Sequence, residues 1–430
     1  MNNQQTDNTS VSLLRDRNFF WLSAGSLISM IGDQFTLIAL PWLVLKMTGD
    51  PLVLGTVLAV TSIPRALFIL VGGALVDRHS PKQVLMLTKV VNTVLLGVLA
   101  ALIFTDRLSL PLVYGMAFAI GLSTAFSIPA ATSIMPHVVA REHLQRANGM
   151  MMGMRQLSFF IGPLLAGGLI ALFGGTTGTV EDAQGLGLAF GLDAISFALS
   201  AWTLSRVAMR TRQDTAAPRS SSVWKSIGEG LAYCWNNRDL RICFTYWAAI
   251  ALFISGPVQV AVPVLADQLG DSAAAFGLLA GAHGAGMLLG MVATGVRPNL
   301  RFGSFGTTLL VIDGAVGVLF MPLGQMAATW QAGLLLLVIG ALGGIVQVKV
   351  YTWLQQAAAP ALLGRTMALF MFIFMGIAPL SSALTGLLMR SITLPQLFAG
   401  CGALMVAIVA VMFALTGMRA VSDVRPARPV

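Results

Sequence analysis

The chain has 430 residues, of which 56% are hydrophobic and only 10% are charged, and its mean hydropathy is +0.82. A water-soluble globule cannot bury that much apolar surface, so the composition excludes a soluble enzyme or binding domain and indicates an integral membrane protein. The three cysteines and four histidines are scattered along the chain, which favours neither a disulfide framework nor a metal site. No metal and no cofactor are expected.

Twelve apolar segments follow one another, each long enough to cross about 30 Å of hydrocarbon as a helix. The first six are expected at residues 19–45, 51–76, 83–104, 110–135, 147–173 and 186–207. The second six are expected at residues 240–266, 273–296, 305–326, 329–356, 366–389 and 397–418. We therefore predict an all-α integral membrane protein with twelve transmembrane helices in two pseudo-symmetric six-helix bundles.

Polar stretches divide the chain into five parts. We expect a cytoplasmic tail at 1–18, an N-terminal bundle at 19–207, a linker at 208–239, a C-terminal bundle at 240–418 and a second cytoplasmic tail at 419–430. Apolar side chains recur at helical spacing from Trp224 to Trp235, which predicts an amphipathic linker helix on the inner membrane surface or, alternatively, an extension of the seventh span. No removable signal peptide is expected, because the polar start leads into the first span without a small-residue cleavage site.

A shift of 219 positions supports a duplication of the six-helix halves. It places Arg297 on Arg78 and Arg365 on Arg146, at corresponding places in the helix order. Duplicated halves are typical of secondary transporters, which bind substrate near mid-membrane.

The basic residues predict the orientation. With the N-terminus inside, the cytoplasmic loops and tails hold nineteen of the 26 Lys and Arg residues, whereas the opposite loops hold only Lys46, Arg107 and Arg390. Short basic loops stay on the cytoplasmic side, so both termini are expected in the cytoplasm of a multi-pass inner-membrane protein. This distribution also explains the net charge of +9 without a nucleic-acid partner.

Ionisable side chains inside the spans are the main functional candidates, because each costs about 3 kcal/mol or more at the bilayer centre. There are eight: Asp33, Arg65, Lys89, Arg155, Asp193, His283, Asp313 and Lys349. The helical rise places Asp33 and Arg65 near mid-membrane, where they could form a fixed ion pair or a titratable site coupled to transport. Arg155 is either a substrate or proton-relay contact or a structural partner of Asp193.

The other intramembrane candidates have simpler interpretations. Lys89 and Lys349 lie nearer the cytoplasmic side and are expected to snorkel. Asp193, His283 and Asp313 are expected to make structural hydrogen bonds. The Gly-x-x-x-Gly pairs at Gly277, Gly286 and Gly340 predict close helix packing and not a nucleotide site, so an ion gradient is the expected energy source.

The stretch from Gly73 through Asp77, Arg78 and Lys82 to Leu85 resembles the loop 2-3 motif of the major facilitator superfamily. Ser80 and Pro81 depart from the family pattern. The resemblance implies that Asp77 faces the start of the eleventh helix at Leu363-Gly364-Arg365 and helps to latch the cytoplasmic side. The cytoplasmic gate is thus expected at Gly73, Asp77, Arg78, Lys82, Arg146 and Arg365.

Further motifs resemble the branch of that family with enterobactin exporters and macrolide-efflux proteins. They include Gly32-Asp33 in the first helix and a fifth-helix motif similar to that of antiporters, with Gly162, Pro163, Gly167 and Gly168. The fourth span lacks the arginine that many drug antiporters carry, so Arg65 or Arg155 is expected to serve instead. The family fold implies that the central cavity involves Asp33, Lys349, Arg65, Arg155, His283, Trp42, Gln259 and Tyr351.

The resemblance implies a secondary active exporter of amphipathic organic compounds, such as an antibiotic or a siderophore, and not an enzyme. We expect alternating access with proton antiport, Asp33 as the coupling carboxylate, and a monomer in the lipid bilayer. The coupling ion could instead be Na⁺. Two alternatives stay open: a lipid or lysophospholipid flippase of the same fold, and a transport-inactive membrane sensor or scaffold.

Overall fold

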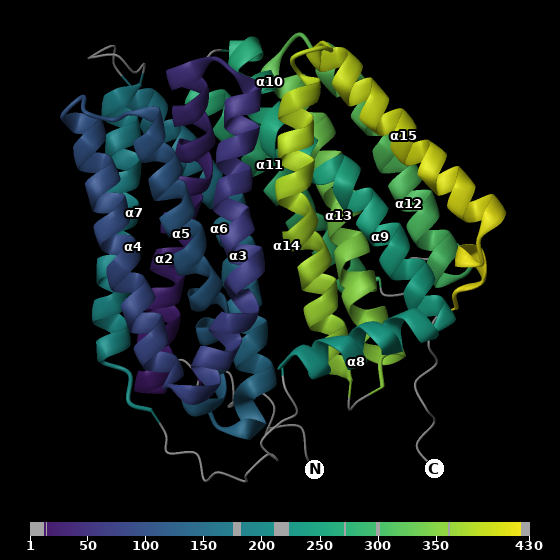
Figure 1. Cartoon of the computed structure of the whole chain (residues 1–430), viewed down its shortest axis with the longest axis horizontal. Coiled ribbons are helices and arrows are strands. Elements are labelled where there is room, and N and C mark those ends of the chain that lie inside the picture. The colour runs from purple at the N-terminus through teal and green to yellow at the C-terminus, as the bar shows by residue number, and fades with distance from the viewer. Residues whose placement is uncertain are drawn as a thin grey trace. The chain divides into compact units, whose positions relative to one another are not determined.

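The computed structural model describes residues 13, 15–174, 182–209, 223–270, 272–297, 302–359 and 362–422. Within these ranges every regular element is a helix (Figure 1). Among the described residues, twelve helices are long and apolar enough to cross a membrane, which confirms the predicted number of spans.

The transmembrane helices occupy the ranges that apolar length predicted, to within a few residues. The first six are α2 (Arg17–Thr48), α3 (Pro51–Arg78), α4 (Pro81–Phe104), α5 (Leu110–Ile134), α6 (Leu144–Phe173) and α7 (Ala183–Ser205). The seventh span combines α9 (Arg238–Gly256), a π turn (Pro257–Ala261) and α10 (Val262–Gly270). The last five are α11 (Ala273–Val296), α12 (Phe305–Phe320), α13 (Thr329–Ala357), α14 (Leu363–Leu388) and α15 (Leu394–Leu415).

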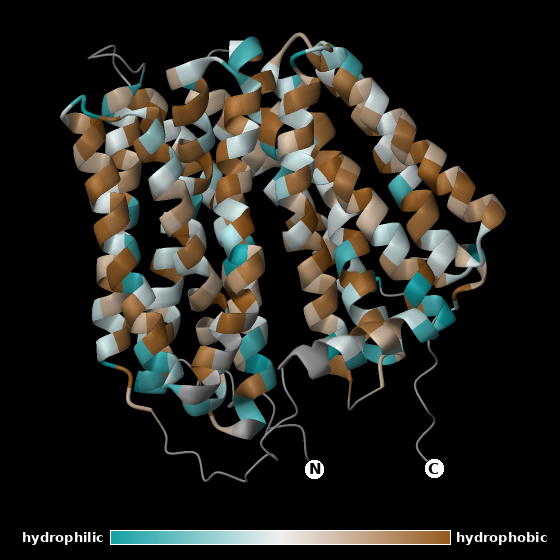
Figure 2. Ribbon diagram, viewed as in Figure 1, coloured by the Kyte–Doolittle hydropathy of each residue, from teal (hydrophilic) through white to brown (hydrophobic). Residues whose placement is uncertain are grey.

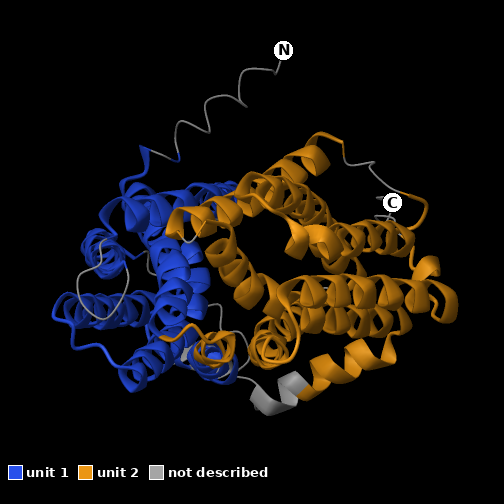
Figure 3. Cartoon of the chain, turned by 90° about the horizontal axis from the view of Figure 1, so that it is seen from above, with its two compact units in different colours: residues 1–47, 60–218 blue, residues 48–59, 219–430 orange. Residues whose placement is uncertain are grey.

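The chain divides into two compact units (Figure 3). Unit 1 comprises Met1–Met47 and Val60–Pro218, and unit 2 comprises Thr48–Ala59 and Arg219–Val430. In unit 1, α4 packs against α5 and α7. In unit 2 the main pairs are α11 with α13, α9 with α14 and α12 with α15.

The first residues of α3 group with unit 2, although the sequence placed the whole second span in the N-terminal bundle. Glycines explain the grouping, because Gly55 faces the backbone of Ser382 and Gly386 faces the backbone of Pro51. The Asp50 carboxylate accepts a 2.7 Å ion-pair hydrogen bond from the Arg390 guanidinium, and it also accepts a 2.8 Å bond from the Leu52 amide. The start of α3 is therefore anchored on the end of α14.

Glycines also determine the packing of α11 against α13. A methyl group at Gly286 or Gly290 would collide with the α13 backbone, and one at Gly340 or Gly344 would collide with the α11 backbone. The prediction that these glycines allow close helix packing is confirmed for all four.

The outer helix surfaces suit a lipid environment. Figure 2 shows hydrophobic residues along most of the length of the helices. Large apolar side chains such as Leu67, Leu172, Leu289 and Val296 are exposed. In a bilayer such side chains replace water contacts with lipid contacts, so their exposure needs no further partner.

The linker forms a separate helix, α8 (Val223–Asn236), and the Asn237 side chain caps the start of α9 by accepting bonds from the amides of Asp239 and Leu240. Cys234 of α8 is buried in an apolar cluster of unit 2. Leu231 and Trp235 are exposed. Thus one side of α8 packs on protein and another is available to the membrane surface.

The last described residues fold back onto the start of α12. The Gly306 amide donates to the Val421 carbonyl at 3.1 Å, and the Ser304 hydroxyl donates to the Arg419 carbonyl at 2.6 Å. The Trp353 indole N–H donates to the Ser422 carbonyl at 3.2 Å. These bonds attach the C-terminal segment to unit 2.

Candidate functional site: a buried polar cluster in unit 1

Small and polar residues form one face of α2. Gly25, Ser29, Gly32 and Thr36 recur at helical spacing and therefore lie along a single stripe. A methyl group at Gly25 would collide with Thr203, and one at Gly32 would collide with side chains of α7, so the two helices approach closely. This approach brings the polar groups of α2 and α7 into hydrogen-bonding distance.

Lys89 of α4 reaches into this interface. Its side chain is only 8% exposed, and its ammonium donates to the Ser29 hydroxyl at 3.3 Å. The ammonium also lies 5.6 Å from the ring centre of Phe197, close enough for a cation–π interaction. The prediction that Lys89 snorkels to the membrane surface is therefore wrong: the chain holds the charge inside.

Serine side chains continue the network behind Lys89. The Ser200 hydroxyl lies 3.5 Å from the Ser29 hydroxyl and donates to the Gly25 carbonyl at 2.7 Å. Ser29 is thus fixed between α4 and α7. This satisfies polar groups that would be costly to leave unpaired in the membrane.

Asp193 of α7 is fully buried on the other part of the stripe. The Thr36 hydroxyl donates to one carboxylate oxygen at 2.5 Å, and the Ser196 hydroxyl donates to the other at 3.1 Å. The expectation of structural hydrogen bonding is confirmed for this residue. Asp313 in unit 2 follows the same rule, because it accepts a 2.6 Å bond from the Tyr246 hydroxyl.

Asp33 differs from Asp193 in its surroundings. It lies in the middle of α2, its side chain is exposed, and no hydrogen bond or ion pair to it occurs among the described residues. The charges of Lys89 and Arg155 both act on its carboxylate, and its own charge acts on Asp193. Asp33 is therefore the accessible acid of a cluster that contains two acids and two bases.

Arg65 does not pair with Asp33, so that prediction is wrong. Its guanidinium donates to the Ser62 hydroxyl at 3.1 Å, and its Nε has no partner within the described ranges. Residue counting estimated how deep each side chain lies in the membrane but not the direction in which it points. Arg155, whose side chain is exposed, is the predicted arginine whose charge acts on the Asp33 carboxylate.

The fifth-helix motif lies next to this cluster. Gly162, Pro163 and Gly167 are buried in α6, while Gly168 is partly exposed. Gly162 faces the side chain of Gln34, the residue that follows Asp33. The motif therefore brings α6 close to α2 beside the candidate acid.

Trp42 is a packing residue and not a cavity residue, which corrects the prediction. It is fully buried, and its indole N–H donates to the Asp182 carboxylate at 3.0 Å. The remaining predicted cavity residues belong to unit 2 and are all partly buried: Gln259, His283, Lys349 and Tyr351.

The unit 2 candidates occupy different settings. Gln259 lies in the π turn of the seventh span. The His283 Nδ1 is buried and lacks a hydrogen-bond partner among the described residues. The Tyr351 hydroxyl donates to the Met371 sulfur at 3.7 Å. Lys349 takes part in at least one polar or electrostatic interaction.

The predicted gate residues lie around the helix ends. The surroundings of Gly73 and the side chains of Asp77 and Arg78 fall outside what the structure describes. Lys82 donates to the carbonyls of Val207 at 2.6 Å and Ser205 at 3.3 Å, where the negative end of α7 favours a cation.

Two further gate candidates are described. Arg146 is exposed in the first turn of α6. Arg365 forms a 2.5 Å ion pair with Glu229 of α8. This contact links the linker helix to the start of α14.

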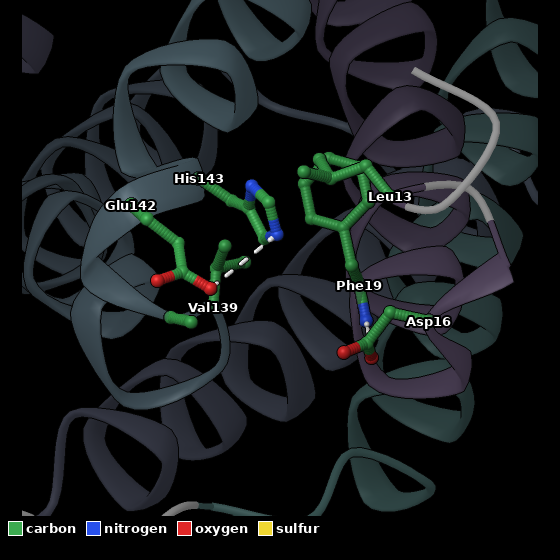
Figure 4. Close-up of a pocket in the computed structure, with 7 residues that line it drawn as sticks. Leu13, Asp16, Phe19, Val139, Glu142 and His143 are labelled. Carbon is green, nitrogen blue, oxygen red and sulfur yellow. Dashed lines mark hydrogen bonds and ion pairs between the residues drawn. The ribbon is translucent and has the colours of Figure 1, made fainter. Parts of the chain in front are cut away.

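A cavity of about 310 Å³ lies at one end of unit 1 (Figure 4). Its walls come from Leu13, Asp16, Phe19, Val139, Ala140, Glu142 and His143, none of which the sequence had selected. Asp16 caps α2 by accepting bonds from the amides of Asn18 and Phe19, and Glu142 lies 3.8 Å from the His143 ring. Local structure thus accounts for the polar groups of this cavity. No cluster with metal-ligand character occurs among the described residues.

Comparisons with known proteins place these features in context. The family model described as Major Facilitator Superfamily matches residues 22–383. Macrolide efflux protein A of Streptococcus pyogenes is 22% identical over 396 residues, which cover 91% of this chain and 94% of that protein. Multidrug efflux pump Tap of Mycobacterium tuberculosis is 28% identical over 227 residues, or 52% of each chain.

Solved structures share the fold. The D-xylose-proton symporter has a TM-score of 0.71 at 13% identity, with 94% of this chain and 99% of that chain covered. The nucleoside transporter NupG has a TM-score of 0.69 at 13% identity, with 92% and 98% covered. At such identities the similarity shows the architecture alone.

Proposed function

This chain belongs to the major facilitator superfamily of membrane transporters, and from that premise we propose that it exports amphipathic organic compounds in exchange for protons. The observation that carries the proposal is Asp33, an exposed carboxylate in the middle of a transmembrane helix on which the charges of Lys89 and Arg155 act. The macrolide and multidrug efflux pumps among its relatives support the direction and the substrate class. Antibiotics and siderophores are the compounds to test.

Proton exchange follows from the charges around Asp33. Two nearby cations favour the ionised carboxylate, whereas the apolar surroundings of the membrane favour the neutral acid. A group balanced between these effects can take up a proton from one side and release it to the other when its access to water changes. We propose that the two units are the parts whose movement changes that access, with both termini in the cytoplasm.

The test is substrate-driven pH change in proteoliposomes, measured across a panel of macrolides, dyes and siderophores. Asp33→Asn is expected to abolish substrate-dependent proton movement, because the amide cannot exchange a proton at this site. Asp106→Asn makes the same chemical change in the loop between α4 and α5 and is expected to leave proton movement intact.

The outcomes separate the alternatives. Proton movement that persists in Asp33→Asn would contradict the assigned role of Asp33. Substrate export that requires Na⁺ and moves no protons would show that Na⁺, and not H⁺, is the coupling ion. Translocation of a lysophospholipid analogue without export of any panel compound would instead support a flippase, and no movement of either class would support a transport-inactive protein.

A further inference from the structure

We propose that Lys89 is the internal counter-charge of Asp33, and that the position of its ammonium sets the pH at which Asp33 takes up and releases a proton. Lys89 acts through Asp33 and is therefore a positioning residue. The inference rests on the proposed function, because it deepens the role of the same site.

The first argument is the isolation of the Lys89 charge. An ammonium carries three N–H donors, yet the Ser29 hydroxyl is its one hydrogen-bond acceptor within the described ranges. A buried charge with so few bonds is costly and normally needs an opposite charge nearby. Asp33 follows Ser29 by four positions on α2, so its carboxylate lies one helical turn from the Lys89–Ser29 contact. The charge of Asp33 also acts on Lys89.

The second argument is the inventory of ionisable groups on the elements around Lys89. The ionisable groups are Arg17, Asp33 and Lys46 on α2, Lys82 on α4 itself, Arg146 and Arg155 on α6, and Asp193 on α7. The two acids among them are Asp33 and Asp193. The α5 segment at 110–134 contains a single ionisable group, Tyr114, and no charged residue.

The two carboxylates differ in what already binds them. Asp193 is engaged by the hydroxyls of Thr36 and Ser196, whereas Asp33 has no direct bond among the described residues. Asp33 is thus the acid whose protonation can respond to the ammonium.

The third argument is the position of Ser29. Its hydroxyl contacts both the Lys89 ammonium at 3.3 Å and the Ser200 hydroxyl at 3.5 Å. Ser200 is itself bound to the Gly25 carbonyl, so Ser29 holds the ammonium at a fixed place behind α2. Without the bond to Ser29, the Lys89 ammonium would be free to move toward the Asp33 carboxylate.

The proposed step is simple in its proton balance. The Asp33 carboxylate accepts one proton from water and becomes a neutral acid, while Lys89 stays protonated throughout. Its ammonium lowers the energy of the ionised form of Asp33 and leaves the neutral form almost unaffected.

The test is an infrared titration of the protein, purified in full length and without substrate. The carboxyl band lost in Asp33→Asn identifies Asp33, and its intensity against pH gives the midpoint of protonation. Lys89→Met keeps most of the side-chain volume without the charge and is expected to raise this midpoint by about one pH unit or more, a tenfold change in proton affinity. Lys89→Arg keeps a positive charge and is expected to restore a midpoint close to that of the unmodified protein.

Ser29→Ala provides a second test that does not remove the charge. It is expected to lower the pH midpoint of Asp33 protonation, because the ammonium can then approach Asp33. If Lys89→Met does not fold, Ser29→Ala alone tests the proposal. Lys46→Met removes a lysine from the end of α2 and should not move the midpoint. An unchanged midpoint in folded Lys89→Met, or in Ser29→Ala where the former cannot be purified, would overturn the proposal.

The titration separates this proposal from the transport function. If Lys89→Met shifts the midpoint but Asp33→Asn exports substrate at the normal rate, the Lys89–Asp33 coupling is upheld and proton antiport at this site is rejected. If the midpoint is unchanged in Lys89→Met but proton movement requires Asp33, proton antiport at this site is upheld and the Lys89–Asp33 coupling is rejected.

Discussion

At the scale of single residues, the two intramembrane aspartates of unit 1 show how their surroundings separate structure from chemistry. Asp193 is fully buried and bound by two hydroxyl groups, whereas Asp33 is exposed and has no hydrogen bond among the described residues. A bound and buried carboxylate stabilises the helix contact. An accessible one can exchange a proton.

The bond between Thr36 and Asp193 gives the first stability prediction. Thr36→Val preserves the shape of the side chain but removes the hydroxyl that donates to the buried carboxylate. We expect a loss of about 1–3 kcal/mol, because a buried acceptor loses its partner. Thermal unfolding in detergent measures the effect, and Thr36→Ser, which keeps the hydroxyl, is the control. Equal melting temperatures for the valine and serine variants would contradict the assigned bond.

The sequence identifies the ionisable residues inside the spans but not the partners that they contact. Asp33 was selected because a carboxylate in an apolar span is rare, and this needs no structure. Its assignment to Arg65 failed because the rise per residue estimates depth but not direction. The expected snorkelling of Lys89 is wrong for the same reason, although the spacing of Ser29, Gly32 and Thr36 indicates a polar face of α2.

At the scale of elements, glycines determine which helices touch. Gly290 of α11 lies against the α13 backbone, whereas Gly295 of the same helix has open space around it. Gly290→Ala is expected to destabilise unit 2 by about 1–3 kcal/mol through overpacking. Gly295→Ala is expected to be neutral or to stabilise by up to about 1 kcal/mol, because alanine favours the helix. Melting temperatures of the two variants test the contrast, which would fail if both moved in the same direction.

The anchor between α3 and α14 predicts a pH dependence. The Arg390 guanidinium beside Asp50, helped by the Leu52 amide, holds the pKa of that carboxyl below its usual value of 3.8. The stabilisation is therefore complete above pH 3.8 and is lost as the pH falls through the lowered pKa in the folded protein.

Asp50→Asn removes this pH-dependent contribution. We expect it to cost about 0.2–1 kcal/mol at neutral pH, because the ion pair is exposed and screened. Thermal unfolding of both proteins between neutral and acid pH should converge below pH 3.8. A difference that persisted unchanged at the acid end would exclude the ion pair as its cause.

Helix positions were predictable because the length of an apolar segment is a strong signal in a membrane protein. Two features of the helices were not predictable from the length of apolar segments. The π turn at Pro257–Ala261 interrupts a segment that is largely apolar, and the Ser381 hydroxyl compensates by accepting a 2.7 Å hydrogen bond from the Gly256 amide. The grouping of residues 48–59 with unit 2 depends on contacts with α14 that lie more than 300 positions away in sequence.

At the scale of the whole molecule, the resemblance of residues 73–85, from the end of α3 into α4, to the family motif predicts a gating role for Asp77. Asp77→Ala is expected to reduce export severalfold while leaving membrane insertion and melting temperature unchanged. The melting temperature should change little because an anion near a helix start contributes only about 0.3–1 kcal/mol. A contact of that size can form and break during transport. Export assays on equal amounts of inserted protein test this, with the same change at the exposed Asp239 of α9, Asp239→Ala, as the control. Full export by Asp77→Ala would reject the gate.

The sequence predicts the whole-molecule architecture better than it predicts the substrate. Twelve spans and the family follow from apolar length and from one loop motif, and both are shown. The substrate depends on the shape and polarity of a surface made by side chains from several helices. No local pattern reports that surface, which is why the compound class has to be tested on a panel.

The attachment of the C-terminal segment has a practical consequence for anyone who labels this protein. Backbone groups of Arg419, Val421 and Ser422 bind the start of α12 and Trp353, so these residues function as part of the folded body. A fluorescent reporter or an affinity tag should be joined beyond residue 422. A deletion that removes Val421 is expected to loosen the α12 end and to lower the yield of purified transporter.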